Sequence, residues 1–117
     1  EAITLFAPSN QAFRNLLASA NTSIDRLQQQ PELLREILLY HVLPESLSAQ
    51  ALADLSGTRI ETLVPSATVG VFQTSYGGII LNRFVEVTEA DLGKGNRRIH
   101  VINDVLLPAS AVQALGL

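Results

Sequence analysis

The stretch TLFAPSNQAF, residues 4–13, begins apolar, turns polar at its centre and then changes period. The apolar character of residues 3–6 predicts a short buried strand. Pro8 ends this strand because proline has no N–H to donate to a neighbouring strand. Ser9 or Asn10 can then cap a helix. The next apolar residues recur at the spacing of one helical face, and they are Ala12, Phe13, Leu16 and Leu17. We therefore expect a strand that turns a tight corner into a helix, with the phenylalanine as its anchor in the core.

Three further helices are predicted in the first half of the chain. A short helix follows the polar break at residues 19–23, and Pro31 opens a longer one because the first turn of a helix tolerates proline. The predicted inner face of the longer helix consists of Leu33, Leu34, Ile37, Leu38 and His41. Ser48 can cap a third helix, which runs through Leu55 and stops at Gly57.

Beyond this point the pattern changes to the period of strands. The predicted strands are residues 58–64, 68–74, 79–81, 84–87, 99–102 and 105–107. Two of them are joined by a hairpin at Tyr76-Gly77-Gly78, a flexible glycine-containing loop is expected at residues 91–96, and a closing helix at residues 109–115. Helices first and strands second, with one early strand, favour a single α+β domain over residues 1–117.

The composition excludes several classes of protein. Hydrophobic residues make up 47% of the 117 residues and charged residues 16%, which argues against disorder. The net charge is −3 and the longest basic run is Arg97-Arg98, so we expect no binding to nucleic acid. Without cysteine there is no disulfide framework, cysteine zinc site or thiol catalysis.

The apolar segments are too short for insertion into a membrane. The longest, residues 37–43, falls far below the roughly 20 residues that span a bilayer. The sequence opens at Glu1, directly before a strand and without an initiator methionine or signal peptide. We therefore expect this domain to be part of a longer chain, with any targeting signal outside it.

Two longer blocks and a dipeptide between them resemble fasciclin domains, the adhesion modules first known from an insect neural protein. The blocks are TLFAPSNQAF at residues 4–13 and IHVINDVLLP at residues 99–108, and the dipeptide is Tyr40-His41. Their order and separation also match the family, so the resemblance covers nearly the whole chain. It implies a twisted β-wedge of about seven strands with a helical layer, an α+β fold.

One departure from the family concerns its leading helices. Members usually carry a helical segment before the first block, and none precedes it in this sequence. We expect that these helices were removed or that another chain or domain covers the surface they would occupy. An uncovered apolar patch would favour association.

The resemblance also implies a function, namely a noncatalytic extracellular module for cell adhesion or matrix interaction that needs no cofactor. In animal members, an Asp followed by an aliphatic residue shortly before the second block, and the tyrosine-histidine region, are linked to integrin recognition. The matching residues are Asp91 and Leu92, and Tyr40 and His41, although the family's motif often has Pro at Ala90 and Ile at Leu92. The implied partners are a cell-surface receptor, integrin-like in an animal, a matrix protein, or a second copy.

Each of these residues also has a structural interpretation. Asp91 can be a solvated loop acid or cap a turn, and Tyr40-His41 can hold its helix against the sheet. His41 and His100 are too few for a zinc site, so we expect buried, hydrogen-bonded histidines, with a pH switch as a minor hypothesis. Asn21 begins the glycosylation sequon Asn-Thr-Ser, whose serine can instead cap the next helical turn.

Two other classes of function remain as alternatives. A structural spacer domain would bind nothing itself, with partners contacting neighbouring domains. An enzyme or small-ligand binder would need a deep pocket with convergent polar groups. Ser9 or Ser75 could be paired with a histidine in a hydrolase, but the sequence has no Gly-x-Ser-x-Gly nucleophile elbow and no acid placed to orient the histidine. We therefore expect no catalysis. The basic residues Lys94, Arg97, Arg98 and Arg83 are offset by nearby acids, so we expect a mixed surface there.

Overall fold

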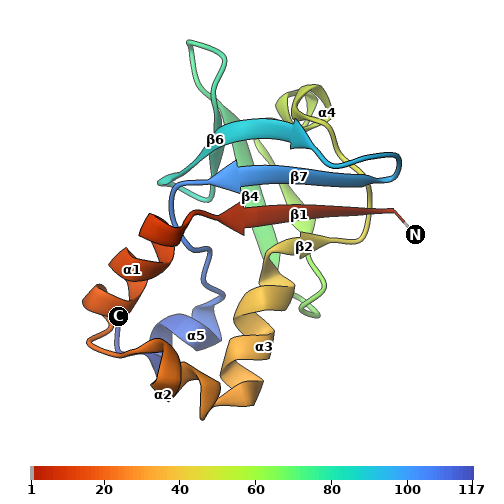
Figure 1. Ribbon diagram of the computed structural model, residues 1–117. Coiled ribbons are helices and arrows are strands. Elements are labelled where there is room, and N and C mark those ends of the chain that lie inside the picture. The colour runs from red at the N-terminus through yellow and green to blue at the C-terminus, as the bar shows by residue number, and fades with distance from the viewer. Residues whose placement is uncertain (1) are drawn as a thin grey trace.

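Seven strands form one sheet that is strongly twisted (Figure 1). The computed structural model describes residues 2–117. The strands are β1 (Ile3–Pro8), β2 (Val42–Leu43), β3 (Thr58–Glu61), β4 (Thr68–Gln73), β5 (Ile79–Leu81), β6 (Val85–Leu92) and β7 (Arg97–Ile102). Their order across the sheet is β2-β1-β7-β6-β5-β4-β3. Among the residues described, only the β1–β7 pair is parallel. The α+β class and the seven-stranded wedge that the resemblance implied are confirmed.

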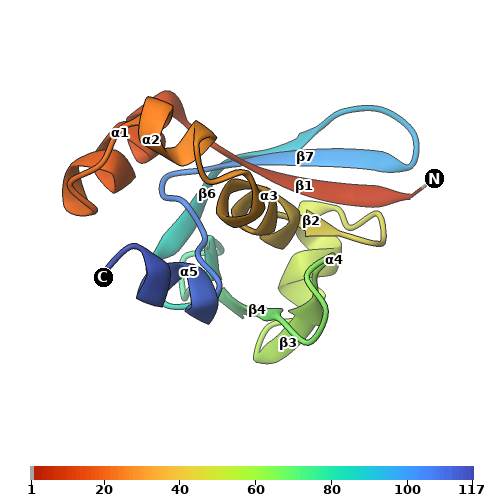
Figure 2. The same cartoon turned by 90° about the horizontal axis from the view of Figure 1, so that it is seen from below.

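Most of the helices gather at one end of the sheet. The helices are α1 (Asn10–Ser19), α2 (Ile24–Gln28), α3 (Pro31–Tyr40), α4 (Ala49–Asp54) and α5 (Ala109–Ala114). Helices α1, α2, α3 and α5 lie below the sheet in Figure 1, whereas α4 lies on the opposite side. Figure 2 shows α3 end-on, with β1 on one side and α5 and the β3–β4 pair on the other.

The helix boundaries follow from side chains that the sequence already presents. Ser9, Ser23 and Ser48 each occupy an N-cap, where the hydroxyl accepts a hydrogen bond from the N–H three residues on, at 3.1, 3.3 and 3.2 Å. Pro31 lies in the first turn of α3, and Gly57 has a φ of +86° after α4. The predicted starts of these four helices are therefore confirmed.

Two apolar clusters form the core. The larger lies between the sheet, α4 and the end of α3, and comprises Phe6, Tyr40, Leu43, Leu47, Leu52, Ile60, Val69, Val71, Ile79, Leu81, Val85, Ile102 and Leu106. The smaller joins α1, α3 and α5 through Ala12, Leu16, Ile37, Val105 and Ala111. The predicted inner faces of the helices are confirmed in part: Ala12 and Leu16 are buried, whereas Phe13 is only partly buried and Leu38 is exposed. Tyr40, which the sequence did not assign to the inner face of its helix, is also buried.

Several strands differ from the prediction, since β3 ends at Glu61 rather than at residue 64 and β7 begins at Arg97 rather than at residue 99. Residues 105–107 form no strand, and the two-residue strand β2 was not predicted. Val105 is buried among α1, α3 and α5, and Leu106 is buried in the larger cluster beneath the sheet, so neither residue is paired in a ladder. A short apolar run does not distinguish these cases. β6 continues to Leu92, beyond the predicted 84–87, because register shifts at Glu89 break the alternation that marks a strand.

Candidate functional site

Asp91 and Leu92 lie at the end of β6, immediately before the turn into β7. They were predicted to lie in a loop, and the structure instead places them in the sheet, with Leu92 opposite Ile99. Asp91 has a φ of +61°, which is a left-handed conformation. Residues other than glycine rarely adopt it, although Asp and Asn do so more often than most. The Asp91 side chain is 44% exposed and Leu92 is 38% exposed, so both can be reached from solvent.

Three contacts hold Asp91 in this conformation. Its backbone N–H donates to Nδ1 of His100 at 3.1 Å. Its Oδ1 accepts a hydrogen bond of 2.9 Å from the N–H of Ala49, the first residue of α4, where a carboxylate is favoured by the orphan N–H groups. The same oxygen lies 3.8 Å from Nη1 of Arg98, in the one ion pair found among residues 2–117. Asp91 therefore fastens the β6–β7 hairpin to α4.

His100 supports this arrangement from the core. Because its Nδ1 accepts the Asp91 N–H, the ring proton is on Nε2, which donates to the carbonyl of Leu47 at 2.7 Å. The imidazole is fully buried, and its centroid lies 6.1 Å from that of the Phe6 ring. The prediction of a buried, hydrogen-bonded histidine is confirmed, and one side chain links β7, the segment before α4 and Asp91.

Tyr40 and His41 are buried at the end of α3, away from solvent. The Tyr40 hydroxyl donates to the carbonyl of Thr68 at 2.6 Å and accepts from Nδ2 of Asn82 at 3.4 Å. Within residues 2–117 neither side chain is hydrogen-bonded to Asp91 or Leu92, so the structure does not bring the two predicted pairs into one contact surface. This geometry favours the structural interpretation, in which the dipeptide holds the helix against the sheet.

His41 joins three segments through hydrogen bonds. Its Nε2 accepts the N–H of Leu106 at 2.9 Å, so the proton is on Nδ1, which donates to the carbonyl of Ile37 at 2.7 Å. Its own carbonyl accepts the N–H of Phe6 at 2.9 Å. Desolvation by burial lowers the pKa of His41 below its ordinary value of 6.5, and the bond to Ile37 opposes this shift in part.

The domain is expected to lose stability as the pH falls below 6.5. The unfolded chain binds a proton at the imidazole of His41 near that pH, whereas the folded protein, with its lowered pKa, does not. Protons therefore favour the unfolded state, by up to about 1.4 kcal/mol at pH 5.5. Urea unfolding at pH 7.5, 6.5 and 5.5 would measure this loss. A His41→Gln variant should show a shallower slope, and an unchanged slope would contradict the assignment.

Asn21 is exposed between α1 and α2, with a φ of +50°. The hydroxyl of Ser23 in the same sequon caps α2 by accepting the N–H of Arg26 at 3.3 Å. Because the two residues use different atoms, the capping role leaves the Asn21 amide accessible. Glycosylation at Asn21 stays a prediction.

The contacts of Asp91 were not predictable from local sequence. Ala49 is 42 residues away and contributes only its backbone N–H, which carries no side-chain signal. From the sequence, Arg98 was predicted to belong to a mixed surface in which nearby acids offset the basic residues. The structure shows which acid is its partner, because Arg98 pairs with Asp91. No helix among residues 2–117 has both the length and the hydropathy needed to cross a bilayer.

Comparisons with known proteins show one consistent similarity. The sequence model of the fasciclin domain matches residues 1–108. Transforming growth factor-beta-induced protein ig-h3 of Sus scrofa is 32% identical over 108 residues, 92% of this chain and 15% of that protein. Protein sll1483 of Synechocystis is 34% identical over 105 residues, 90% of this chain and 54% of the relative. Immunogenic protein MPB70 of Mycobacterium bovis is 34% identical over 105 residues, 90% of this chain and 49% of the relative.

A solved structure has the same fold. It is a FAS1 domain pair from the insect cell adhesion molecule fasciclin I, which superposes with a TM-score of 0.66 at 22% sequence identity. The match covers 90% of this chain and 36% of the insect chain. The chain thus spans about half or less of the length of each relative named here.

Proposed function

Since the chain belongs to the fasciclin domain family, we propose that it is a noncatalytic adhesion module that acts outside the cell through protein–protein contacts. Its fold is shared with a protein described as an insect cell adhesion molecule, which supports this assignment. The partner is a cell-surface receptor, integrin-like if the source is an animal, or a matrix protein. Self-association is the other form of contact that the proposal includes.

The exposed pair Asp91 and Leu92 is the proposed contact point. The observation that carries this choice is the left-handed φ of Asp91, held by hydrogen bonds to His100 and Ala49. Because the backbone is already fixed, a partner would bind the pair with little loss of conformational entropy. The exposed carboxylate could also complete the coordination of a hard cation on a receptor, and Leu92 supplies an apolar contact beside it.

Tyr40 and His41 have a supporting role in this proposal. Both side chains are buried and hydrogen-bonded within the domain, so a direct contact with a partner would require the end of α3 to unpack. Substitutions at Tyr40 or His41 would lower adhesion by unfolding the domain, so the loss of adhesion would follow the fraction of molecules that are unfolded. Substitutions at Asp91 and Leu92 would lower it in the folded protein.

Cell attachment to a surface coated with the protein tests this assignment. Asp91→Asn keeps an oxygen for the Ala49 N–H and tolerates the positive φ, but it removes the charge. We expect Asp91→Asn combined with Leu92→Ala to reduce attachment about tenfold or more, the effect of losing a charged contact. Asp25→Asn, at an exposed acid on α2, is the matched control and should attach like the parent.

The two remaining outcomes would reject the assignment in different ways. If attachment persists in the double variant, adhesion depends on another surface. If the parent itself does not attach, a structural spacer with no binding surface of its own becomes the better description. Melting temperatures of all variants must agree for either comparison.

A further inference from the structure

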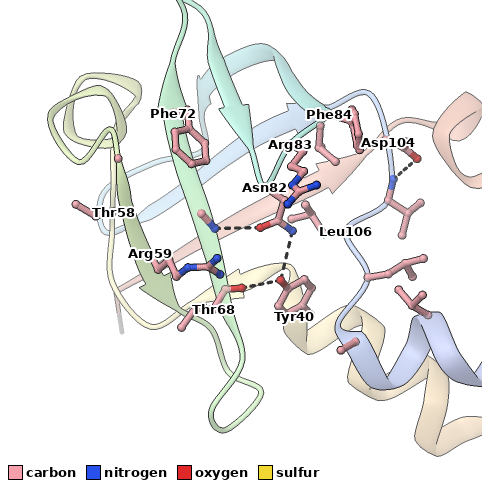
Figure 3. Close-up of a pocket in the computed structure, with 17 residues that line it drawn as sticks. Tyr40, Thr58, Arg59, Thr68, Phe72, Asn82, Arg83, Phe84, Asp104 and Leu106 are labelled. Atoms are coloured by element: carbon pink, nitrogen blue, oxygen red, sulfur yellow. Dashed lines mark hydrogen bonds between the residues drawn. The ribbon is translucent and has the colours of Figure 1, made fainter.

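A groove of about 920 Å³ lies beside strands β3 and β4, at one edge of the sheet (Figure 3). One wall consists of β3, β4 and the turn between β5 and β6, and the other consists of residues 104–107 and α5. Tyr40 closes the groove where these walls meet α3. Neither Asp91 nor Leu92 lines it, so the groove is separate from the proposed adhesion contact.

The floor of the groove is a row of three residues, which come from β3, from β4 and from the turn after β5. Arg59 of β3 lies opposite Gly70 of β4. Gly70 in turn accepts the N–H of Asn82 at 2.7 Å and donates to Oδ1 of Asn82 at 3.0 Å. The glycine leaves space in the middle of the row, since a Cβ there would reach Cε2 of Phe72 at 3.4 Å. The opposite face of the same strands carries core residues such as Ile60 and Val69.

The polar groups at the floor are locked in orientation. The Asn82 amide donates to the Tyr40 hydroxyl at 3.4 Å, which itself donates to the carbonyl of Thr68 at 2.6 Å. Figure 3 shows these bonds running from β4 through Asn82 to Tyr40. The amide and the phenol are therefore occupied, and a ligand would not depend on them for its main polar contact.

Two aromatic rings stand at the groove without being buried. Of the four phenylalanines, Phe72 is 47% exposed and Phe84 is 81% exposed, and both line the groove. Figure 3 shows them on either side of Asn82 and Arg83. Exposed aromatic surface is unfavourable in water, and two such rings beside one groove provide stacking surfaces for a flat apolar group.

The charge beside these rings is positive and unpaired. The one ion pair among residues 2–117 involves Arg98 and Asp91, so Arg59 and Arg83 have no carboxylate partner in the described chain. This local charge contrasts with a net charge of −3 for the whole chain. Asp104 also lines the groove, but it belongs to the opposite wall, where its carboxylate accepts the N–H of Val105 at 2.8 Å. An anion is therefore favoured at the arginine wall and disfavoured at the Asp104 wall.

We propose that this groove binds a small aromatic carboxylate, with its ring against Phe72 and Phe84 and its carboxylate on Arg59 and Arg83. Planar guanidinium groups match a carboxylate in geometry as well as in charge. The volume of about 920 Å³ lies within the roughly 300–1,000 Å³ of small-ligand sites. The sequence alternative of a small-ligand binder thus has a physical site in this domain, in addition to the proposed adhesion function.

Binding of 2-naphthoate, measured by ¹⁵N NMR titration of the protein, tests the proposal. We expect saturable shifts centred on Gly70 and Asn82, and binding of the neutral analogue 2-naphthamide about tenfold weaker because it lacks the charged contact. Arg59→Gln and Arg83→Gln should each weaken the binding of 2-naphthoate by a similar factor. Arg26→Gln, at an exposed arginine on α2, is the control and should bind like the parent.

A second variant tests the shape of the groove. Gly70→Ala adds one methyl group to the floor in ordinary contact with Phe72, so the fold should persist while the ring is displaced and the affinity falls. The proposal is overturned if 2-naphthamide binds as well as 2-naphthoate, if the arginine variants bind unchanged, or if the shifts scatter over the surface. It is also overturned if the groove residues shift with protein concentration alone, because a second copy would then occupy the groove.

Discussion

Replacing His100 with leucine is expected to lower the free energy of unfolding by roughly 2–5 kcal/mol, the largest effect of any single polar substitution we predict. The leucine fills a similar volume but leaves the carbonyl of Leu47 and the N–H of Asp91 without partners. Both groups lie in or beside the core, where an unpaired donor or acceptor costs far more than a lost surface bond. Urea unfolding of the parent and the variant would measure the loss.

Two milder substitutions separate the contributions of the two ring nitrogens of His100. Glutamine can place an N–H near the carbonyl of Leu47, and asparagine can place an oxygen near the N–H of Asp91. Each should recover part of the stability that leucine loses, and only asparagine should keep the Asp91 amide protected from hydrogen exchange. If the free energy of unfolding of the leucine variant falls by less than about 1 kcal/mol, water has replaced the two hydrogen bonds of His100, and the expectation is contradicted.

Gly93→Ala is expected to have the second largest effect, a loss of about 2 kcal/mol or more. Gly93 has a φ of +91°, which L side chains rarely adopt, and a Cβ built there would overlap the carbonyl oxygen of Arg97. The overlap is with backbone, so the β6–β7 turn must open to relieve it. Because Asp91 and Leu92 precede this turn directly, the variant should also lose cell attachment at temperatures where it is folded.

Gly95 offers a matched control in the same turn. Its φ is also positive, at +63°, but apart from its chain neighbours no heavy atom of residues 2–117 lies within 4 Å of a Cβ at that position. Gly95→Ala should therefore cost only the left-handed strain, about 1–2 kcal/mol. Thermal unfolding of the two variants isolates the overlap with Arg97. Equal losses in both would contradict the steric explanation for Gly93.

The features that sequence reasoning predicted well depend on residues close together in the chain. Ser9, Ser23 and Ser48 cap helices that begin at the next residue, so each capping signal is contained within four positions. The hairpin around Gly77 joins β4 and β5 as predicted, because a φ of +88° requires a glycine there. The order of helices and strands predicted the α+β class, and the family blocks implied the seven-stranded wedge.

The features that were missed depend on contacts between distant segments. The Asp91 carboxylate meets α4 through a backbone N–H, which any residue at position 49 would supply. Val105 packs against helices and Leu106 packs in the cluster beneath the sheet, and their apolar pattern is the same as that of a buried strand. The groove required the sheet register, because only pairing aligns Arg59, Gly70 and Asn82.

The position of β1 in the sheet has a consequence for synthesis of the chain. β1 lies between β2 and β7, and its parallel partner begins at Arg97, opposite Ile3. The ribosome makes β1 long before it makes that partner, so the strand must wait, with one edge open, until nearly the whole domain has emerged. Such non-local pairing slows folding and leaves the nascent chain open to association. We expect a chain stalled before residue 97 to be sensitive to protease, and one released after α5 has emerged to become resistant.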